Sequence, residues 1–326
     1  MREESTKKID VAVVGAGPVG LSVGIALKRK GLSYMLFDKG CLVNALYHFP
    51  DNMTFFSTSR LLEIGEIPFV SKNDKPTRDE ALEYYRRVAE HFDLELSLYN
   101  KVENIRGQKG EFTIRSSKGI WTAKSIVLST GFYDRPRKLN IPGEDLPKVM
   151  HYFRNAHPYY RQKVLVVGAA NSACDVALEL LRVGADVSMA IRGNEISPRV
   201  KYWIRPNIIN RIKEGSISAY FKTRVVEIRE NEIILEKDSK TFKIENDYVF
   251  AMTGYQPDLK FLKESGIKIA DDSEKIPQCS EDSRETNVAG IYLAGVLCGG
   301  LVTSKYFIEN TRHHGQLIAA DLSKNN

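Results

Sequence analysis

Residues 11–31 read VAVVGAGPVGLSVGIALKRKG, and residues 164–184 read VLVVGAANSACDVALELLRVG. In both stretches an apolar run typical of a buried strand leads into a turn of small residues and then into a helical pattern. This strand–turn–helix unit is typical of dinucleotide-binding folds, because free N–H groups at the start of the helix bind a pyrophosphate. The repetition predicts two nucleotide sites in one chain.

The first turn carries the spacing G-x-G-x-x-G at Gly15, Gly17 and Gly20. The first glycine permits the tight turn, the second lets the backbone approach a pyrophosphate, and the third allows close packing of helix on strand. Pro18 is tolerated because the N–H of the first helical turn has no partner within the helix. Asp38 closes the next strand, where a carboxylate accepts hydrogen bonds from ribose hydroxyls. A purely structural glycine turn is the weaker interpretation.

The second turn is a looser version, with Gly168, Ala170 and Ala173 at the three positions. Arg192 stands after its second strand, where the first unit has Asp38. A carboxylate repels a 2′-phosphate, whereas a guanidinium binds one in a charge-assisted fork. The two units are therefore expected to prefer different coenzymes.

Arg199 and Lys201 follow Arg192 and can share the same phosphate, although cations in a loop can also be simply solvated. The first unit is expected to bind an adenosine without a 2′-phosphate, and the second an adenosine with one. The simplest pairing is therefore FAD in the first unit and NADPH in the second. Hydride transfer from a nicotinamide to a flavin needs no protein acid or base. No side chain is therefore assigned a catalytic role in that step.

Composition excludes several classes of protein. The 326 residues are 43% hydrophobic and 27% charged, with a net charge of +6, and no dense basic run suggests nucleic-acid binding. No stretch is expected to span a membrane. Cys41, Cys174, Cys279 and Cys298 form no C-x-x-C pair, so neither a metal site nor a redox dithiol is expected from spacing. Reduced thiols and a cytoplasmic location are the expectation.

Apolar runs and helical patterns alternate, which favours an α/β architecture with parallel sheets. Two antiparallel meanders interrupt this alternation, roughly at residues 95–121 and 216–244. The strands are expected at residues 11–14, 34–37, 125–129 and 187–191, and the helices at residues 18–30, 77–91 and 303–323. The second of these helices has Thr77 at a plausible N-cap and Glu80 three residues later.

The prediction for the whole chain is two Rossmann-like domains, each of three layers with a central parallel sheet and a small antiparallel meander. The FAD-binding domain is expected at residues 1–133 and 255–326. The NADPH-binding domain, residues 134–254, is inserted into it, because residues 131–136 concentrate proline and glycine and the C-terminal tail has no nucleotide turn of its own.

The order of GAGPVG, VVGAANSACDVALELL and AMTGYQPD resembles flavoproteins of thioredoxin-reductase-like size with two dinucleotide-binding domains. Within that group, TFFSTSRLLEIG, PGEDLPKVMHYF, RGNEISPRVKYWI and FIENTRHHG resemble the bacillithiol-disulfide-reductase family, also called the YpdA family. The resemblance implies an enzyme that uses FAD and NADPH to reduce a small disulfide such as oxidised bacillithiol, and that assembles as a homodimer or higher oligomer.

The expected contacts combine the turn residues with positions implied by this resemblance. For FAD they are Gly15, Gly17, Pro18, Val19, Gly20, Asp38, Lys39, Asn44, Tyr47, Phe55, Val102, Thr130, Gly131, Gly295 and Val296. For NADPH they are Gly168, Ala169, Ala170, Asn171, Ser172, Arg192, Arg199, Lys201, Thr253 and Gly254. No metal site is expected.

The sequence departs from the family at Val19, where many members carry a cysteine in the turn G-x-G-P-C-G. Valine cannot form a mixed disulfide, so thiol exchange at this turn is excluded. Among the other cysteines Cys298 is the candidate to test, since it follows the AGV segment expected at the flavin. Cys279 is expected in an exposed acidic loop and Cys174 in a core. His313 and His314 are expected to be packing or surface residues.

Two enzymatic hypotheses remain open. One is an NADPH-dependent reductase of a small anionic disulfide. The other is an NADPH–ferredoxin or NADPH–flavodoxin oxidoreductase, which needs no redox cysteine and can dock an acidic carrier on a mildly basic surface. A redox sensor that binds both cofactors is a third interpretation, which no feature of the sequence favours.

Overall fold

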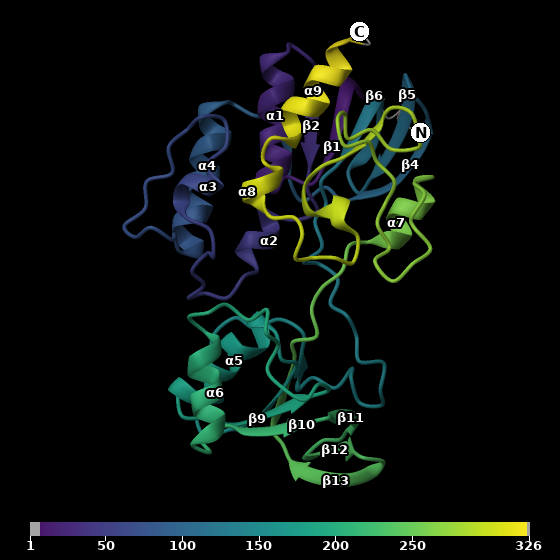
Figure 1. Cartoon of the computed structure of the whole chain (residues 1–326). Helices are drawn as coiled ribbons and strands as arrows, with labels where there is room; N and C mark the ends of the chain where they lie inside the picture. Colours follow the sequence, from purple (N-terminus) through teal and green to yellow (C-terminus); the bar gives the residue numbers. More distant parts are fainter. Residues whose placement is uncertain (1–6, 325–326) are drawn as a thin grey trace. The chain divides into compact units, whose positions relative to one another are not determined.

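The structure, a computed structural model, describes residues 7–324, and the chain divides into two compact units (Figure 1). Unit 1 contains the chain up to His48, Asn52–Arg135 and the chain from Tyr255 onward. Unit 2 contains Pro136–Gly254 together with Phe49–Asp51. Unit 2 is thus an insertion, entered after Arg135 and left at Gly254.

The short segment Phe49–Asp51 belongs to unit 2, whereas it was expected in the FAD-binding domain together with the rest of residues 1–133. Asp51 N donates a hydrogen bond to Arg154 O at 2.8 Å, and Asn155 Nδ2 donates to the Asp51 carboxylate at 3.2 Å. These bonds attach the segment to unit 2.

Unit 1 is built on a seven-stranded sheet with the order β3-β2-β1-β6-β5-β4, and β15 also pairs with β6. Pairing is parallel except within β4–β6. The strands are β1 (Lys7–Val14), β2 (Tyr34–Phe37), β3 (Leu96–Ser97), β4 (Val102–Gln108), β5 (Glu111–Ser116), β6 (Gly119–Leu128) and β15 (Ile291–Leu293).

Strand β6 joins two elements that the sequence pattern separates, the end of the meander and the buried strand expected at residues 125–129. Its first half alternates between buried and more exposed residues, while Ser125–Leu128 is continuously buried. The first half pairs antiparallel with β5, and the strand pairs parallel with β1 along its length. One strand therefore shows two burial patterns, because only its second half is covered on both faces.

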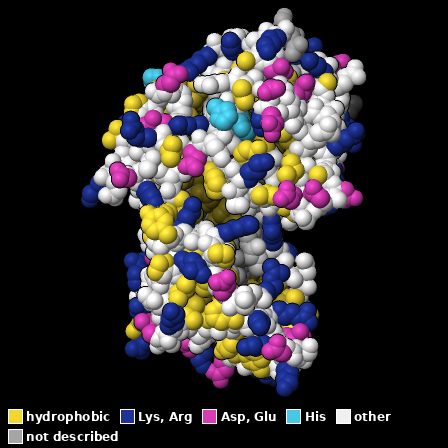
Figure 2. Space-filling model, viewed as in Figure 1, with side chains coloured by type: hydrophobic (Ala, Val, Ile, Leu, Met, Phe, Trp, Pro, Cys, Tyr) yellow, Lys and Arg dark blue, Asp and Glu magenta, His cyan; other side chains and the backbone are white. Residues whose placement is uncertain are grey.

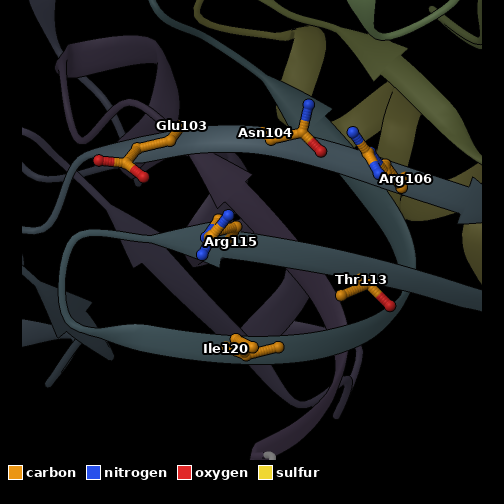
Figure 3. A pocket seen from close by; sticks show the side chains of 6 residues that line it. All are labelled: Glu103, Asn104, Arg106, Thr113, Arg115 and Ile120. Carbon is orange, nitrogen blue, oxygen red and sulfur yellow. The ribbon is translucent and has the colours of Figure 1, made fainter.

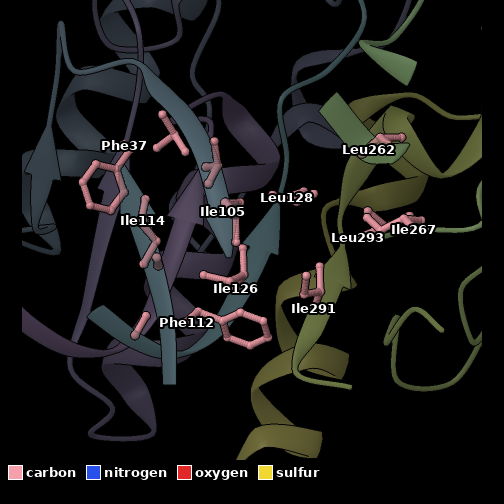
Figure 4. Packing of buried hydrophobic residues seen from close by; sticks show 14 of the residues in the cluster. Phe37, Ile105, Phe112, Ile114, Ile126, Leu128, Leu262, Ile267, Ile291 and Leu293 are labelled. Atoms are coloured by element: carbon pink, nitrogen blue, oxygen red, sulfur yellow. The ribbon is translucent and has the colours of Figure 1, made fainter. Parts of the chain in front are cut away.

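A single hydrophobic core shows that the tail completes unit 1. Phe37, Phe112, Ile126 and Leu128 from the first part of the chain pack in one cluster with Leu262 and Leu293 from beyond residue 255 (Figure 4). The segment after the insertion therefore belongs to the first sheet, as its lack of a nucleotide turn suggested.

Unit 2 contains a five-stranded parallel sheet of order β10-β9-β8-β14-β7 and a separate antiparallel sheet, β11-β12-β13. The strands are β7 (Val149–Met150), β8 (Lys163–Val167), β9 (Asp186–Ile191), β10 (Ser218–Phe221), β11 (Thr223–Ile228), β12 (Glu232–Lys237), β13 (Lys240–Glu245) and β14 (Tyr248–Ala251). The expectation that the meander begins at residue 216 is wrong, because β10 extends the parallel sheet beside β9.

The helices of unit 1 are α1 (Pro18–Arg29), α2 (Asn44–Tyr47), α3 (Ser59–Leu62), α4 (Arg78–His91), α7 (Leu259–Glu264), α8 (Ile308–Thr311) and α9 (His314–Lys324); those of unit 2 are α5 (Asn171–Arg182) and α6 (Arg205–Lys213). Short 3₁₀ segments occupy η1 (His157–Tyr159) and η2 (Gly295–Gly299). The predicted cap of α4 is confirmed: Thr77 and Glu80 form a reciprocal capping box.

The single helix expected at residues 303–323 is wrong. The structure has α8 and α9 instead, interrupted near Arg312. The Ser22 hydroxyl donates to Arg312 O, and Arg312 Nη1 donates to Glu63 O at 2.9 Å. These contacts fix the break beside α1, which α9 packs against (Figure 1). Among the helices of residues 7–324, none is both long and apolar enough to cross a bilayer.

Candidate functional site

The three glycines of the first turn have different surroundings. A Cβ on Gly15, whose φ is +109°, would lie 2.5 Å from Ser129 O, and a Cβ on Gly20 would overlap Gly15 O. A Cβ on Gly17 would meet no protein atom within 4 Å. Two glycines therefore permit close packing, and Gly17 leaves its backbone open on the side where a pyrophosphate can approach.

Helix α1 begins directly at this opening. Its N-cap is Gly17, no side chain caps it, and its first turn contains no acidic residue. The unpaired N–H groups and the positive end of the helix dipole remain available to an anion. The turn therefore fits the phosphate part of a dinucleotide such as FAD.

Asp38 has a structural role that sequence reasoning missed. Its carboxylate accepts hydrogen bonds from Ala16 N and Gly40 N, each at 2.9 Å, one on each oxygen. Burial raises the pKa of Asp38, and the two N–H groups oppose that shift. The side chain thus links the glycine turn to the loop after β2, and each oxygen keeps a lone pair that can face a ribose. Lys39 next to it forms an ion pair with Asp134 at 2.9 Å.

Other residues expected at FAD come together because the parallel strands end at one edge of the sheet. Ser129 N donates to Val14 O at 2.8 Å, and Ala294 N donates to Leu128 O at 2.9 Å. These bonds bring the residues that follow β6 and β15, Thr130 and Gly295 among them, to the edge where β1 ends. A Cβ on Gly295 would lie 3.4 Å from the Val19 side chain, so these two expected contacts are direct neighbours.

The remaining expected FAD contacts differ in exposure. Asn44, Thr130, Gly131 and Val296 are half-buried, whereas Tyr47 is exposed. Phe55 and Val102 are buried, and Val102 packs in the core of unit 1. The Val102 side chain is therefore mainly a core residue.

The second turn has a comparable opening. Gly168 has φ +137°, and a Cβ there would lie 2.6 Å from Met252 O. Helix α5 begins after Ala170, with no side-chain cap and no acidic residue in its first turn. Ala169 is half-buried, and Ser172 is exposed. The start of this helix is also open to an anion.

The basic loop after β9 is hydrogen-bonded to this turn. Ser197 N donates to Ala169 O at 3.0 Å, and Lys201 N donates to Asn171 Oδ1 at 2.9 Å. The structure therefore brings Arg199 and Lys201 to the start of α5, a proximity that spacing alone did not show.

Arg192 follows the last residue of β9 and is exposed. Within residues 7–324 it has no carboxylate partner. Thr253 and Gly254 lie where the chain leaves unit 2; the Thr253 hydroxyl donates to Arg137 O, and Gly254 has φ +91°. The second unit thus presents an unpaired cation at the position where the first unit has Asp38.

The burial of Cys279 differs from the prediction. Cys279 is half-buried and packs against the core cluster that contains Cys298, so its expected place in an exposed loop is wrong. Cys298 is buried, and Cys174 is fully buried, as expected. Cys41 is half-buried, and its thiol lies 3.6 Å from Asn44 Oδ1.

Within residues 7–324 no group of three or more His, Cys, Asp or Glu side chains can hold a metal ion.

His314 is fully buried beside the expected flavin segment. Its Nδ1 accepts a hydrogen bond from Gly295 N at 3.2 Å. Burial lowers the pKa of His314 to about 3, with the Arg284 charge acting in the same direction, so the ring is neutral near pH 7. The expectation of a packing residue is confirmed, with an added role as hydrogen-bond acceptor.

One surface hollow is also present that none of the residues of the two turns line. On the face shown in Figure 2, basic and acidic side chains are interspersed. A shallow hollow lies over β4–β6 on the solvent side of these strands (Figure 3). Its lining consists of Glu103, Asn104, Arg106, Thr113, Arg115 and Ile120. This hollow is separate from the carboxyl ends of the parallel strands, where nucleotides bind in folds of this kind.

Comparison with known proteins agrees with this geometry. A family model described as pyridine nucleotide-disulphide oxidoreductase matches residues 12–295. The Bacillus subtilis (strain 168) protein named bacilliredoxin reductase Bdr is 42% identical over 314 residues, which are 96% of this chain and 97% of that protein.

Two solved structures described as bacillithiol disulfide reductase Bdr (YpdA) are also similar. The Bacillus cereus protein is 40% identical and the Staphylococcus aureus protein 38% identical, each with a TM-score of 0.96. Each comparison covers 98% of this chain and 100% of the other. The predicted fold class and the family resemblance are thereby confirmed. The chain belongs to the pyridine nucleotide-disulphide oxidoreductase family and is an NADPH-dependent flavoprotein oxidoreductase with FAD as its second cofactor.

Proposed function

We propose that unit 1 binds FAD, that unit 2 binds NADPH, and that the electrons pass to bacillithiol disulfide. The observation that carries this proposal is the opposite charge at two equivalent positions, Asp38 after β2 and Arg192 after β9, in a chain 40% identical to a bacillithiol disulfide reductase. The domain boundaries follow: residues 1–133 and 255–326 for FAD, and residues 134–254 for NADPH, close to the division between the units.

When bound, FAD supplies two-electron redox chemistry that the side chains of the protein cannot provide. The residues of this chain bind and orient. The backbone N–H groups at Gly17 and at the start of α1 donate hydrogen bonds to the FAD pyrophosphate, and Asp38 orients the ribose beside it. Asn171 and Ser172, at the start of α5, bind the NADPH pyrophosphate. The cations Arg192, Arg199 and Lys201 bind the 2′-phosphate of NADPH.

The acceptor is a small anionic disulfide, or a mixed disulfide between the small thiol and a carrier protein. The similar proteins bear both kinds of name, bacillithiol disulfide reductase and bacilliredoxin reductase. We also place the enzyme in the cytoplasm, where thiols are kept reduced. We expect a homodimer or a higher homo-oligomer, which light scattering of the purified protein will measure.

The second candidate is an NADPH–ferredoxin or NADPH–flavodoxin oxidoreductase. Val19 favours it, because the glycine turn carries no thiol beside the expected flavin segment. Such a reaction moves electrons to a carrier protein without thiol exchange.

An anaerobic assay separates the two candidates. NADPH oxidation is followed with bacillithiol disulfide, glutathione disulfide, ferredoxin or flavodoxin as the acceptor. Bacillithiol disulfide, alone or together with a bacilliredoxin, is expected to accelerate turnover more than the others. Turnover with ferredoxin and none with any disulfide would overturn the proposal.

A further inference from the structure

The segment that contains Cys279 folds back along the chain that contains Cys298. Leu301 N donates to Glu274 O at 2.7 Å, and Leu293 N donates to Arg284 O at 2.9 Å. Between these contacts Cys279 forms an antiparallel bridge with Thr286. This backbone pairing brings Cys279 against η2, which carries Cys298.

Cys279 packs against the core cluster that contains Cys298, and the two thiols differ in exposure. The adjacent Cys298 thiol lowers the pKa of Cys279, and the Arg284 charge acts in the same direction. The Cys279 thiol, together with burial, raises the pKa of Cys298. Cys279 is half-buried and can be reached from solvent, whereas Cys298 is only 4% exposed. In dithiol pairs the more exposed thiol with the lower pKa attacks the substrate, and the buried thiol with the higher pKa resolves the mixed disulfide. Cys279 has the first set of properties and Cys298 the second.

Arg284 supplies a positive charge beside the pair. The residue is 8% exposed, and within residues 7–324 no carboxylate forms an ion pair with it. Its Nη2 donates to Glu281 O, while its Nε has no partner in that part of the chain. A buried cation without a counter-charge is unfavourable, and a thiolate on the neighbouring cysteine provides that counter-charge.

The backbone at Arg284 supports a functional role. Its φ of +66° lies in the left-handed region, which side chains other than glycine rarely adopt. Such conformations persist where the surroundings impose them, often at functional sites. Here the conformation accompanies a guanidinium that is buried beside two thiols.

The pair also lies close to the first nucleotide turn. Segment η2 begins at Gly295, which contacts Val19 of the turn, and Cys298 stands in the same short segment. The turn itself has no thiol, and Cys298 follows Gly295 in the segment beside it.

We propose that Cys279 and Cys298 are a redox-active dithiol that exchanges with the disulfide substrate, with Cys279 attacking and Cys298 resolving. The proposal rests on the proposed function for the source of its electrons and the class of its substrate, an anionic low-molecular-weight disulfide. It assigns a redox pair that C-x-x-C spacing cannot reveal.

The thiol–disulfide exchange between this dithiol and the substrate takes place in two steps. The Cys279 thiolate attacks one sulfur of the substrate RSSR, so a Cys279–SR bond forms and one RS⁻ leaves. Cys298 then loses its proton and attacks the Cys279 sulfur, so the intramolecular S–S bond forms and the second RS⁻ leaves. Each cycle yields two RSH, and reduction of the Cys279–Cys298 bond consumes one NADPH and one proton.

The first test uses the whole flavin-loaded chain with dithiobis(nitrobenzoate), a dianionic disulfide whose released thiolate is coloured. The wild type is expected to release two thiolates per probe molecule consumed and to yield a Cys279–Cys298 linked peptide by mass spectrometry. Cys298→Ser should release one thiolate and keep the probe on Cys279. Cys174→Ala, which changes a buried cysteine of unit 2, serves as the control and should behave as the wild type.

Anaerobic NADPH titration of the probe-oxidised protein provides the second readout. The oxidised wild type is expected to consume one NADPH per chain more than Cys279→Ser. Equal consumption, or an oxidised wild type without the linked peptide, would overturn the proposal even if Cys298→Ser does not fold. If the pair cycles but bacillithiol disulfide gives no turnover, the proposed substrate is wrong and the dithiol stands.

Discussion

Asp38 and Arg192 occupy the same position in two copies of one strand–turn–helix unit, each directly after the second strand. Topology fixes this position, so the sequence was sufficient to predict both residues and the charge contrast between them. The two backbone hydrogen bonds that Asp38 accepts were not predictable, because they depend on the path of the loop around Gly40.

Replacing Arg192 with alanine tests coenzyme selection. The variant loses a charge-assisted contact of about 1.5–3 kcal/mol, so KM for NADPH should rise about 10- to 150-fold while KM for NADH stays nearly constant. Steady-state kinetics with both coenzymes measure the ratio. Arg182→Ala, at the far end of α5 and paired with Glu179, is the control. An equal loss with NADH would refute the 2′-phosphate assignment.

The buried hydrogen bond from Gly295 N to His314 leads to a prediction about how the stability of the protein depends on pH. The pKa of about 3 in the folded protein lies below the ordinary histidine pKa of 6.5, so the unfolded chain binds the proton more readily between these values. The stability contribution is therefore complete above pH 6.5 and is lost as the pH falls toward 3.

His314→Asn keeps an acceptor near Gly295 N and removes the titration. Between pH 7 and pH 5, its free energy of unfolding should fall by about 2 kcal/mol less than that of the wild type. Denaturant unfolding at both pH values provides the measurement, with the exposed His91→Asn as the control. Parallel pH dependence in His314→Asn and the wild type would show that His314 is not the titrating group.

At the scale of elements, local patterns predicted the cores of strands and helices, while tertiary contacts decided where several of them end. The capping box of α4 is local and was predicted from Thr77 and Glu80. The break between α8 and α9 depends on Ser22 and on backbone carbonyls near residue 63, far away in sequence. The place of β10 beside β9 likewise depends on parallel pairing between distant segments, which residue alternation does not encode.

Two glycines of the first turn give opposite expectations. Gly17→Ala places a Cβ in open space, so the chain should fold normally, with an unfolding midpoint near that of the wild type, but bind FAD more weakly. Gly20→Ala places a Cβ on Gly15 O, so helix α1 must move away from the sheet and the protein should be strongly destabilised or insoluble. Thermal unfolding and FAD titration of both variants provide the comparison. Full FAD affinity in Gly17→Ala would show that the pyrophosphate does not approach at that glycine.

At the scale of the whole molecule, the inserted arrangement was predictable because only two segments carry a nucleotide turn and the tail carries none. The structure divides the chain at Pro136 and Tyr255, near the crossings placed by proline and glycine content. The pairing of Cys279 with Cys298 was not predictable, because no spacing motif links them and only the fold of residues 274–301 brings them together.

The central claim is that one chain holds FAD in one unit and NADPH in the other, with electrons passing between them. Anaerobic titration of the purified protein with NADPH, and separately with NADH, tests it directly through the visible absorbance of the flavin. We predict a yellow protein with about one FAD per chain that NADPH bleaches fully and NADH bleaches slowly. A colourless protein that does not take up added FAD, or a flavin that NADPH does not reduce, would contradict the account.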